Sequence, residues 1–178
     1  LSRMTLKEKV RLSYAQSKFS TPGVARLGIP ELYWSDGPHG VRMEINWNDW
    51  NHANWTNDSI TAFPALTALA ATWNPEMSAA YGKAIGEEAL YREKDVMLVP
   101  YIQEMQKNGV AACVKHYAVN NQETWRNHID VNVSDRALYE IYLPAFKAAI
   151  VEGGSWTIMG AYNKIAGQHA CHNDRMLN

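Results

Sequence analysis

The chain lacks an excess of charge of either sign, and it contains no long apolar segment. Its 178 residues include 17 Lys and Arg against 18 Asp and Glu, so the formal net charge is −1. Nucleic-acid binding depends on clustered basic side chains, and this balance argues against it. No apolar run approaches the roughly 20 residues that cross a bilayer, so we expect no membrane span.

Cysteine is scarce as well. The two residues, Cys113 and Cys171, are too few for a disulfide framework and lack the spacing of a redox or zinc pair. One further group of potential ligands matches no standard metal-binding spacing, and it consists of His169, Cys171, His172 and Asp174. We therefore expect neither a metal ion nor another cofactor.

Tryptophan and tyrosine are plentiful, whereas phenylalanine is not. The sequence has seven Trp and nine Tyr against three Phe. Trp and Tyr combine a flat apolar face with a hydrogen-bonding edge, which suits sugars and polar clefts. Structural packing explains the same bias equally well, so composition alone names no function.

Short apolar segments alternate with longer helix-like segments along the chain. Strands are predicted at 31–34, 95–99, 110–114 and 155–159, and helices at 5–16, 74–92, 100–109 and 134–152, with a long loop over 42–59. Strands that alternate with helices form a parallel sheet with right-handed crossovers. Four such units make half of an eight-stranded barrel, which typically needs ~250 residues. The predicted fold class is therefore α/β, a partial (β/α)8 TIM-type barrel with about its first four strands, in a single incomplete domain over 1–178.

Polar side chains follow three of these strands at their carboxyl ends, the edge that carries the site in parallel α/β folds. Asp36 follows the first strand, Lys115 and His116 follow the third, and Tyr162 follows the fourth. Taken singly, Asp36 suits a turn, His116 a buried core position and Tyr162 simple packing. Taken together, a carboxylate that accepts from two hydroxyls and three side chains that donate to others form a recognition set for a neutral polyol.

Several segments of the sequence carry a more specific pattern. They include GIPELYWSDGPHGVR, TAFPALTALAATWNPE, CVKHYAVNNQE, VSDRALYEIYLPAFKAAI and IMGAYNKIAGQHACHN. Over nearly the whole chain, these motifs resemble the amino-terminal barrel of glycoside hydrolase family 3, and its bacterial β-glucosidase and β-xylosidase branch most of all. The resemblance implies an enzyme that removes single sugars from the non-reducing ends of β-linked glycans, with retention at the anomeric carbon.

The resemblance also implies roles for individual residues. Asp36 would accept hydrogen bonds from two hydroxyls of the terminal sugar, and Lys115 and His116 would donate to neighbouring ones. Met159 and Tyr162 would border the same subsite. Glu123 occupies a family position that would support the lysine. The implied partner is a β-linked oligosaccharide or an aryl glucoside, and the implied location is periplasmic or extracellular.

The chain departs from the family pattern in two ways. The nucleophilic aspartate and the acid/base glutamate are expected beyond Asn178, in a missing carboxyl-terminal part of the enzyme. In addition, the connection near 99–110 is shorter than in the family and lacks an arginine that contacts the sugar. The leading hypothesis is thus a fragment of a β-glucosidase that is inactive alone. The alternatives are a β-xylosidase or related pentosidase, and a non-catalytic carbohydrate-binding or degenerate module.

Overall fold

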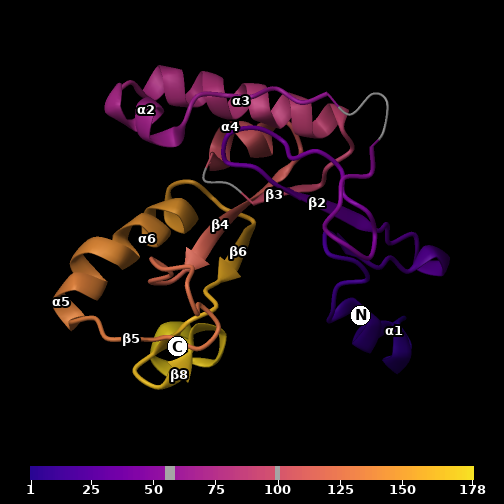
Figure 1. Cartoon of the computed structure of the whole chain (residues 1–178). Helices are drawn as coiled ribbons and strands as arrows, with labels where there is room; N and C mark the ends of the chain where they lie inside the picture. The colour runs from indigo at the N-terminus through magenta and orange to yellow at the C-terminus, as the bar shows by residue number, and fades with distance from the viewer. Residues whose placement is uncertain (55–58, 99–100) are drawn as a thin grey trace.

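A curled sheet with four parallel strands organises the molecule (Figure 1). The computed structural model describes residues 1–54, 59–98 and 101–178. Its main sheet has the order β1-β2-β3-β4-β6, in which β1 is antiparallel to β2 and the other neighbours are parallel. The strands are β1 (Ser20–Thr21), β2 (Leu32–Asp36), β3 (Val96–Leu98), β4 (Ala111–Tyr117) and β6 (Thr157–Gly160). This confirms the partial barrel with about four βα strands.

The predicted helices begin where their capping residues indicate. Thr5 forms a capping box with Glu8, Asn74 Oδ1 accepts from Met77 N at 2.9 Å, and Ser134 Oγ accepts from a helix amide. Such caps satisfy backbone donors that have no partner within the helix. The longer helices are α1 (Leu6–Leu12), α3 (Pro75–Tyr91) and α6 (Leu143–Val151), and the shorter ones are α2 (Leu66–Ala71), α4 (Ile102–Lys107), α5 (Asp135–Ala137) and α7 (Asp174–Leu177).

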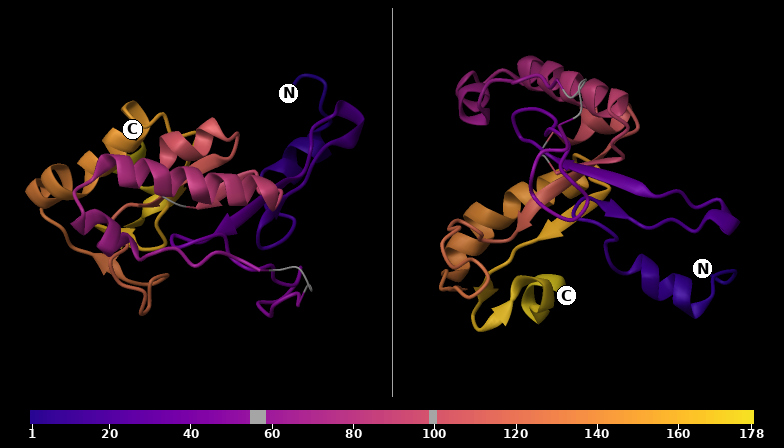
Figure 2. Two further views of the ribbon diagram at one scale, coloured as in Figure 1. Left: turned by 90° about the horizontal axis from the view of Figure 1, so that it is seen from above. Right: turned by 45° about the vertical axis from the view of Figure 1, so that its right-hand side comes forward.

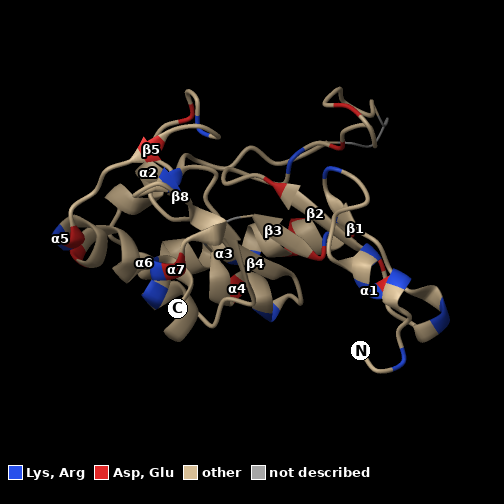
Figure 3. Cartoon of the chain, turned by 90° about the horizontal axis from the view of Figure 1, so that it is seen from below, with Lys and Arg blue, Asp and Glu red and all other residues tan. Residues whose placement is uncertain are grey.

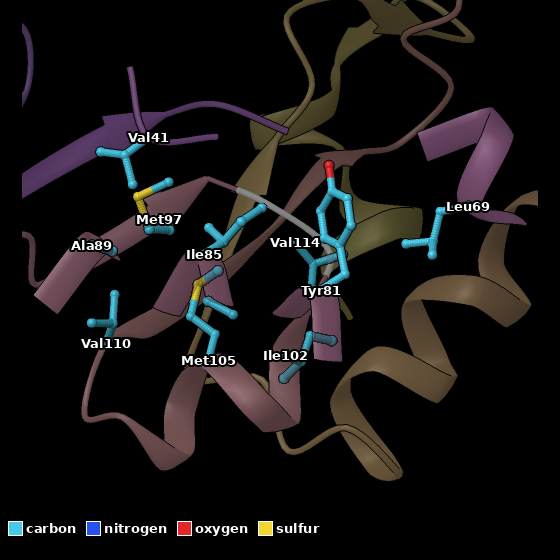
Figure 4. Close-up of a cluster of buried hydrophobic side chains, with 11 residues drawn as sticks. Val41, Leu69, Tyr81, Ile85, Ala89, Met97, Ile102, Met105, Val110 and Val114 are labelled. Carbon is cyan, nitrogen blue, oxygen red and sulfur yellow. The ribbon is translucent and has the colours of Figure 1, made fainter. Parts of the chain in front are cut away.

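Two glycines let α3 lie close to α4. Gly82 and Gly86 are four residues apart, so they occupy the same face of α3. A methyl group on Gly82 would come within 3.0 Å of Tyr101 Cβ, and one on Gly86 within 3.1 Å of Met105 Cα. The close helix pair covers one face of the sheet. Figure 4 shows the resulting core, where Ile85, Met97 and Met105 are fully buried (labelled with their neighbours in the figure).

The other face of the sheet carries a smaller apolar cluster that lies beneath the polar strand ends. Val96, Leu98, Ala111 and Cys113 are buried there, and Phe19, Trp34 and Met159 pack against them. Alternate residues of a strand point to opposite sides. Asp36 therefore shares this face with Trp34, and Lys115 shares it with Cys113.

A second sheet lies towards the carboxyl terminus and was not predicted (Figure 2). Its strands are β5 (Asp130–Val131), β7 (Lys164–Ile165) and β8 (Gln168–His169). Leu138 and Ile165 belong to the core on which it packs, and Tyr117 Oη, at the end of β4, donates to Met176 O at 2.8 Å. This small sheet thereby fixes the chain that follows Tyr162, because β7 begins two residues later.

Several details of the predicted elements need correction. Strand β2 extends to Asp36 and β4 to Tyr117, so Asp36, Lys115 and His116 lie within the last residues of their strands rather than after them. Helix α2 lies in a stretch with no predicted helix, and the helix that begins after Ser134 is interrupted by a π-helical turn at Leu138–Tyr142. The Thr5 helix ends at Leu12, four residues before its predicted end. Helix α4 lies in the parallel crossover from β3 to β4. The strand predicted at 95–99 ends at a residue outside the described ones, since the structure does not describe 99–100.

Charge is dispersed over the chain. Figure 3 shows basic and acidic positions interspersed along most elements rather than separated by sign. Within the described residues, no helix has the length and apolar character that a membrane crossing requires.

Candidate functional site

An ion pair joins the carboxyl ends of β2 and β4. Lys115 Nζ donates to Asp36 Oδ1 at 2.6 Å, and the two side chains remain 24% and 35% exposed. Strand β3 lies between the two strands, and Asp36 is aligned with its last residue, Leu98. The pair is thus open to a ligand from the carboxyl edge of the sheet. Asp36 retains acceptor capacity and Lys115 retains donors, because a carboxylate has about four lone-pair sites and an ammonium has three hydrogens.

His116 follows the lysine and lies against Tyr162. Their ring centroids are 5.5 Å apart at an interplanar angle of 51°. Burial lowers the pKa of His116 below its usual value, and the nearby positive charge of Lys115 lowers it further. Both effects disfavour the charged imidazole. His116 is therefore neutral at pH 7, with one nitrogen that donates and one that accepts.

The neighbours of His116 determine which nitrogen carries the proton. Asn120 Nδ2 lies 3.1 Å from Glu123 Oε1 and 3.4 Å from His116 Nδ1. A carboxylate only accepts, so the group of Asn120 that faces Glu123 must be its amide NH₂. The same NH₂ faces Nδ1, which therefore accepts. The proton of His116 then resides on Nε2, where it is available to a ligand hydroxyl.

Glu123 was expected to support Lys115, but the structure places it elsewhere. Its carboxylate accepts from Asn120 and from Arg126 Nη1, the latter at 2.5 Å. The Arg126 hydrogen bond is the main reason why the pKa of Glu123 lies below its usual value. Glu123 thus acts on His116 through Asn120, whereas the described partner of the lysine is Asp36.

Arg126 was missed at the level of sequence. Its guanidinium carbon lies 4.0 Å from the centre of the Tyr162 ring, and its side chain also binds Glu123. A cation over an aromatic face stabilises the ring in place. The only signal in the sequence is its position, ten residues after His116 in the polar stretch that contains Asn120 and Glu123.

Met159 lies lower in the site than the polar residues. It is partly buried on β6 and packs against the cluster that contains Leu98 and Cys113. Met159 therefore forms part of the apolar floor below the polar groups. Within the parts of the chain that the structure describes, no group of three or more His, Cys, Asp or Glu side chains could hold a metal ion.

Comparisons with known proteins identify the family of this chain. Residues 93–178 match the model of the glycosyl hydrolase family 3 N terminal domain. Over 208 aligned positions, the whole chain is 64% identical to the β-glucosidase BoGH3A of Bacteroides ovatus. The chain belongs to glycoside hydrolase family 3. It covers 28% of BoGH3A, so it corresponds to a part of that family 3 protein.

Solved structures of family 3 proteins share its fold. The β-glucosidase 3B of Thermotoga neapolitana, in complex with glucose, matches with a TM-score of 0.87 and 33% identity over 99% of this chain and 30% of its own. A β-glucosidase of Kluyveromyces marxianus, also with glucose, matches with a TM-score of 0.89 and 29% identity over 99% of this chain and 24% of its own. This chain thus spans less than a third of each of these relatives.

The alignment with BoGH3A also shows a difference in length. Its 208 positions hold the 178 residues of this chain, so about 30 positions of BoGH3A have no counterpart here. This chain is therefore shorter than the matching region of that relative.

Proposed function

We propose that the polypeptide carrying this chain is a retaining, exo-acting β-glucosidase that removes terminal β-D-glucosyl residues from the non-reducing ends of glycans or aryl glucosides. The observation that carries the proposal is the 2.6 Å pair between Asp36 and Lys115, beside His116 and Tyr162, at the carboxyl edge of the sheet. The names of BoGH3A and of the glucose-bound relatives support glucose as the sugar.

Each polar group has a distinct task in binding the terminal glucose. Asp36 accepts from two adjacent hydroxyls, while Lys115 holds the carboxylate in place and donates its remaining hydrogens. His116 donates from Nε2, since Asn120 occupies its Nδ1 side. These groups are fixed before the ligand arrives, which reduces the entropy lost on binding. Met159 supplies the apolar floor below the sugar.

The chemical step needs two further carboxyl groups. Retaining hydrolysis uses a nucleophile and an acid/base that are about 5–5.5 Å apart. We place both outside residues 1–178, in the part of the enzyme that this chain does not include. This chain would then contribute to binding of the terminal sugar, and the missing part would contribute the reacting groups.

The short crossover between β3 and β4 belongs to the same proposal. A shortened connection near 99–110 would account for positions of BoGH3A that have no counterpart in this chain. An arginine expected there by resemblance is absent, so the terminal sugar would have one cationic contact fewer. The periplasmic or extracellular location also stays a prediction.

A pentosidase is the second candidate. An exo-α-(1→6)-L-arabinopyranosidase of Bifidobacterium longum is 33% identical over 98% of this chain. The match covers 27% of the length of that relative. A relative of this chain is therefore named for a pentose rather than for glucose. A β-xylosidase remains a prediction on the same basis, because none of the residues placed here discriminates the C6 group of glucose.

The test compares chromogenic β-glucoside and β-xyloside with the complete polypeptide. We expect β-glucoside to have the higher kcat/KM, and the product to form first as the β-anomer by NMR. Lys115→Met should reduce kcat/KM at least tenfold, since hydrogen bonds to charged groups contribute about 1.5–3 kcal/mol. Lys107→Met is the matched control, because Lys107 is 67% exposed and pairs with Glu104 on α4.

Three results would contradict the proposal. Preference for β-xyloside would favour the pentosidase. First release of the α-anomer would exclude retention. Saturable glucose binding without turnover of either substrate would favour a carbohydrate-binding module.

A further inference from the structure

A cavity of about 600 Å³ lies among helices α3, α4 and α6, and we call it the α4 groove. Helix α4 has six residues and α3 has 17, so the short helix leaves space beside its longer neighbour. Tyr101, Ile102, Val114 and Phe146 give the groove an apolar surface. Small side chains line its two walls, namely Ser78 and Ala79 on α3 and Ala145, Ala148 and Ala149 on α6. Small wall residues let a further helix approach closely, because the side chains at the contact set the distance between helix axes.

The rim of the α4 groove is acidic. Glu152 borders it just after the last residue of α6, and its carboxylate forms no ion pair in the described part of the chain. Glu104 also borders the groove and has Lys107 as its partner. The carboxyl end of α6 adds partial negative charge. The described lining has one basic residue, Lys115, which Asp36 already neutralises. The groove therefore suits an occupant that is apolar on one face and cationic beside it.

Helix α1 has this complementary chemistry. None of its seven residues is buried, and Leu6 and Val10 are 77% and 53% exposed. They are four residues apart, so they form one apolar stripe along the helix. Successive residues of a helix are rotated by about 100°, which places Lys7 and Lys9 on the two sides of this stripe. Neither lysine forms an ion pair with the residues that the structure describes.

The conformation of α1 is fixed without any contact of its apolar stripe. Thr5 forms the capping box, and Glu8, the single acidic residue of the helix, accepts from Arg26 Nε and Nη2 at 2.7 Å each. A helix that is already formed loses less entropy when it docks. Because Arg26 neutralises Glu8, the remaining charges of α1 are basic.

The two complementary surfaces lie apart in the molecule. Figures 1 and 2 show α1 separated from α3, α4 and α6 in each view. Since the pair between Glu8 and Arg26 holds α1 in place, its stripe does not reach the groove of its own chain. A net charge of −1 produces little repulsion between two copies of the chain.

We propose that α1 of one chain docks in the α4 groove of a second copy, with Leu6 and Val10 between α3 and α6 and with Lys7 and Lys9 beside the acidic rim. Such a contact of a helix in a groove uses apolar anchors at positions i and i+4. Two copies that exchange α1 reciprocally form a closed dimer, because the same two surfaces then meet twice. The proposal concerns self-association and goes beyond the proposed β-glucosidase function.

Sedimentation velocity of the 178-residue chain, over roughly a hundredfold range of micromolar concentrations, tests the proposal. The average mass should increase with concentration. Leu6→Glu should weaken association at least tenfold, because it places a charge among the apolar walls. Glu152→Lys should weaken it about threefold or more, since it reverses the charge of the rim. Leu90→Glu is the matched control: Leu90 is 55% exposed on α3, lies outside both surfaces, and its substitution should leave association unchanged. A chain that stays monomeric, or a Leu6→Glu variant that associates as strongly as the unsubstituted chain, would overturn the proposal.

Chemical cross-linking identifies the contact itself. A carbodiimide joins a lysine amine to a neighbouring carboxylate, and a mixture of isotope-labelled and unlabelled chains reveals which links connect two copies. We expect mixed-isotope peptides that link Lys7 or Lys9 to Glu104 or Glu152. The proposal fails if these lysines link only to other carboxylates, or only within one chain. Neither measurement depends on hydrolysis, so its outcome is independent of the proposed β-glucosidase function.

Discussion

Replacing Asp36 by Asn in the complete polypeptide tests the central assignment of the site. The substitution keeps the size of the side chain and removes the charge that binds both Lys115 and the sugar. Hydrogen bonds to charged groups contribute about 1.5–3 kcal/mol each, and two of them are at stake. Because the amide keeps one acceptor oxygen, we expect the lower end of their sum, about 3 kcal/mol. This corresponds to a decrease in kcat/KM of roughly 150-fold.

The same substitution should have little effect on stability. The Asp36 side chain is 35% exposed, and ion pairs of this kind contribute about 0.2–1 kcal/mol to the free energy of unfolding. Asp95→Asn provides the opposite pattern, since Asp95 Oδ2 accepts from Tyr33 N at 2.7 Å at the other edge of the sheet. That control should lower the free energy of unfolding by about 1 kcal/mol and leave kcat/KM within about threefold.

Steady-state kinetics on an aryl β-glucoside and urea unfolding monitored by circular dichroism measure the two quantities separately. The reasoning fails if Asp36→Asn retains more than a tenth of the kcat/KM of the unsubstituted enzyme. It also fails if Asp95→Asn loses as much activity as Asp36→Asn, because the decrease would then reflect a general disturbance of β2 and β3. In either case Asp36 would be a turn residue at the end of its strand.

Three further predictions concern this chain. Residues 1–178 alone should show no hydrolysis of a chromogenic β-glucoside, and turnover that disappears in Lys115→Ala would contradict this. The chain should lose stability as the pH falls from about 6.5, since the unfolded state gains a proton on His116 that the folded state gains only at lower pH. Urea unfolding at pH 7.5 and pH 5 measures this loss, and His116→Gln should reduce it. An identical pH dependence in the variant and the unsubstituted chain would refute the prediction. Gly86→Ala should lower the free energy of unfolding by about 1–3 kcal/mol because its methyl group meets Met105 Cα, whereas Lys83→Ala, on the exposed face of α3, should change it by less than about 0.5 kcal/mol.

The parallel sheet could be predicted because its signals are local. Each strand of the barrel is a short apolar segment, and α3 has both a capping asparagine and a proline in its first turn. Helix α2 has no such signal: Ala65 precedes it and makes no side-chain cap. The strands of the second sheet are two residues long, and the pairing of Asp130 with Lys164 joins segments that are far apart in the sequence. No local pattern specifies such a contact.

The candidate site likewise contains residues that could be predicted from the sequence and residues that could not. Asp36, Lys115 and His116 could be predicted because they stand at the ends of apolar strands, where parallel sheets carry their sites. The tasks of Asn120 and Arg126 depend on side-chain contacts across a loop, namely those with Glu123 and Tyr162, which the spacing of residues does not determine. The expected link from Glu123 to Lys115 illustrates this limit.

The two acidic residues that the site contains are unsuited to proton transfer in the proposed reaction. A general acid at neutral pH needs a raised pKa, which glycosidases obtain by placing a carboxyl group in an apolar or negatively charged environment. Glu123 has the opposite environment, because its hydrogen bond with Arg126 lowers its pKa and favours the ionised form. Asp36 is engaged by Lys115 and is assigned to the sugar hydroxyls. In the proposed function both carboxylates therefore serve recognition, and we place the reacting pair in another part of the enzyme. It follows that the isolated chain should retain contacts for the terminal glucose while lacking the groups that break its glycosidic bond.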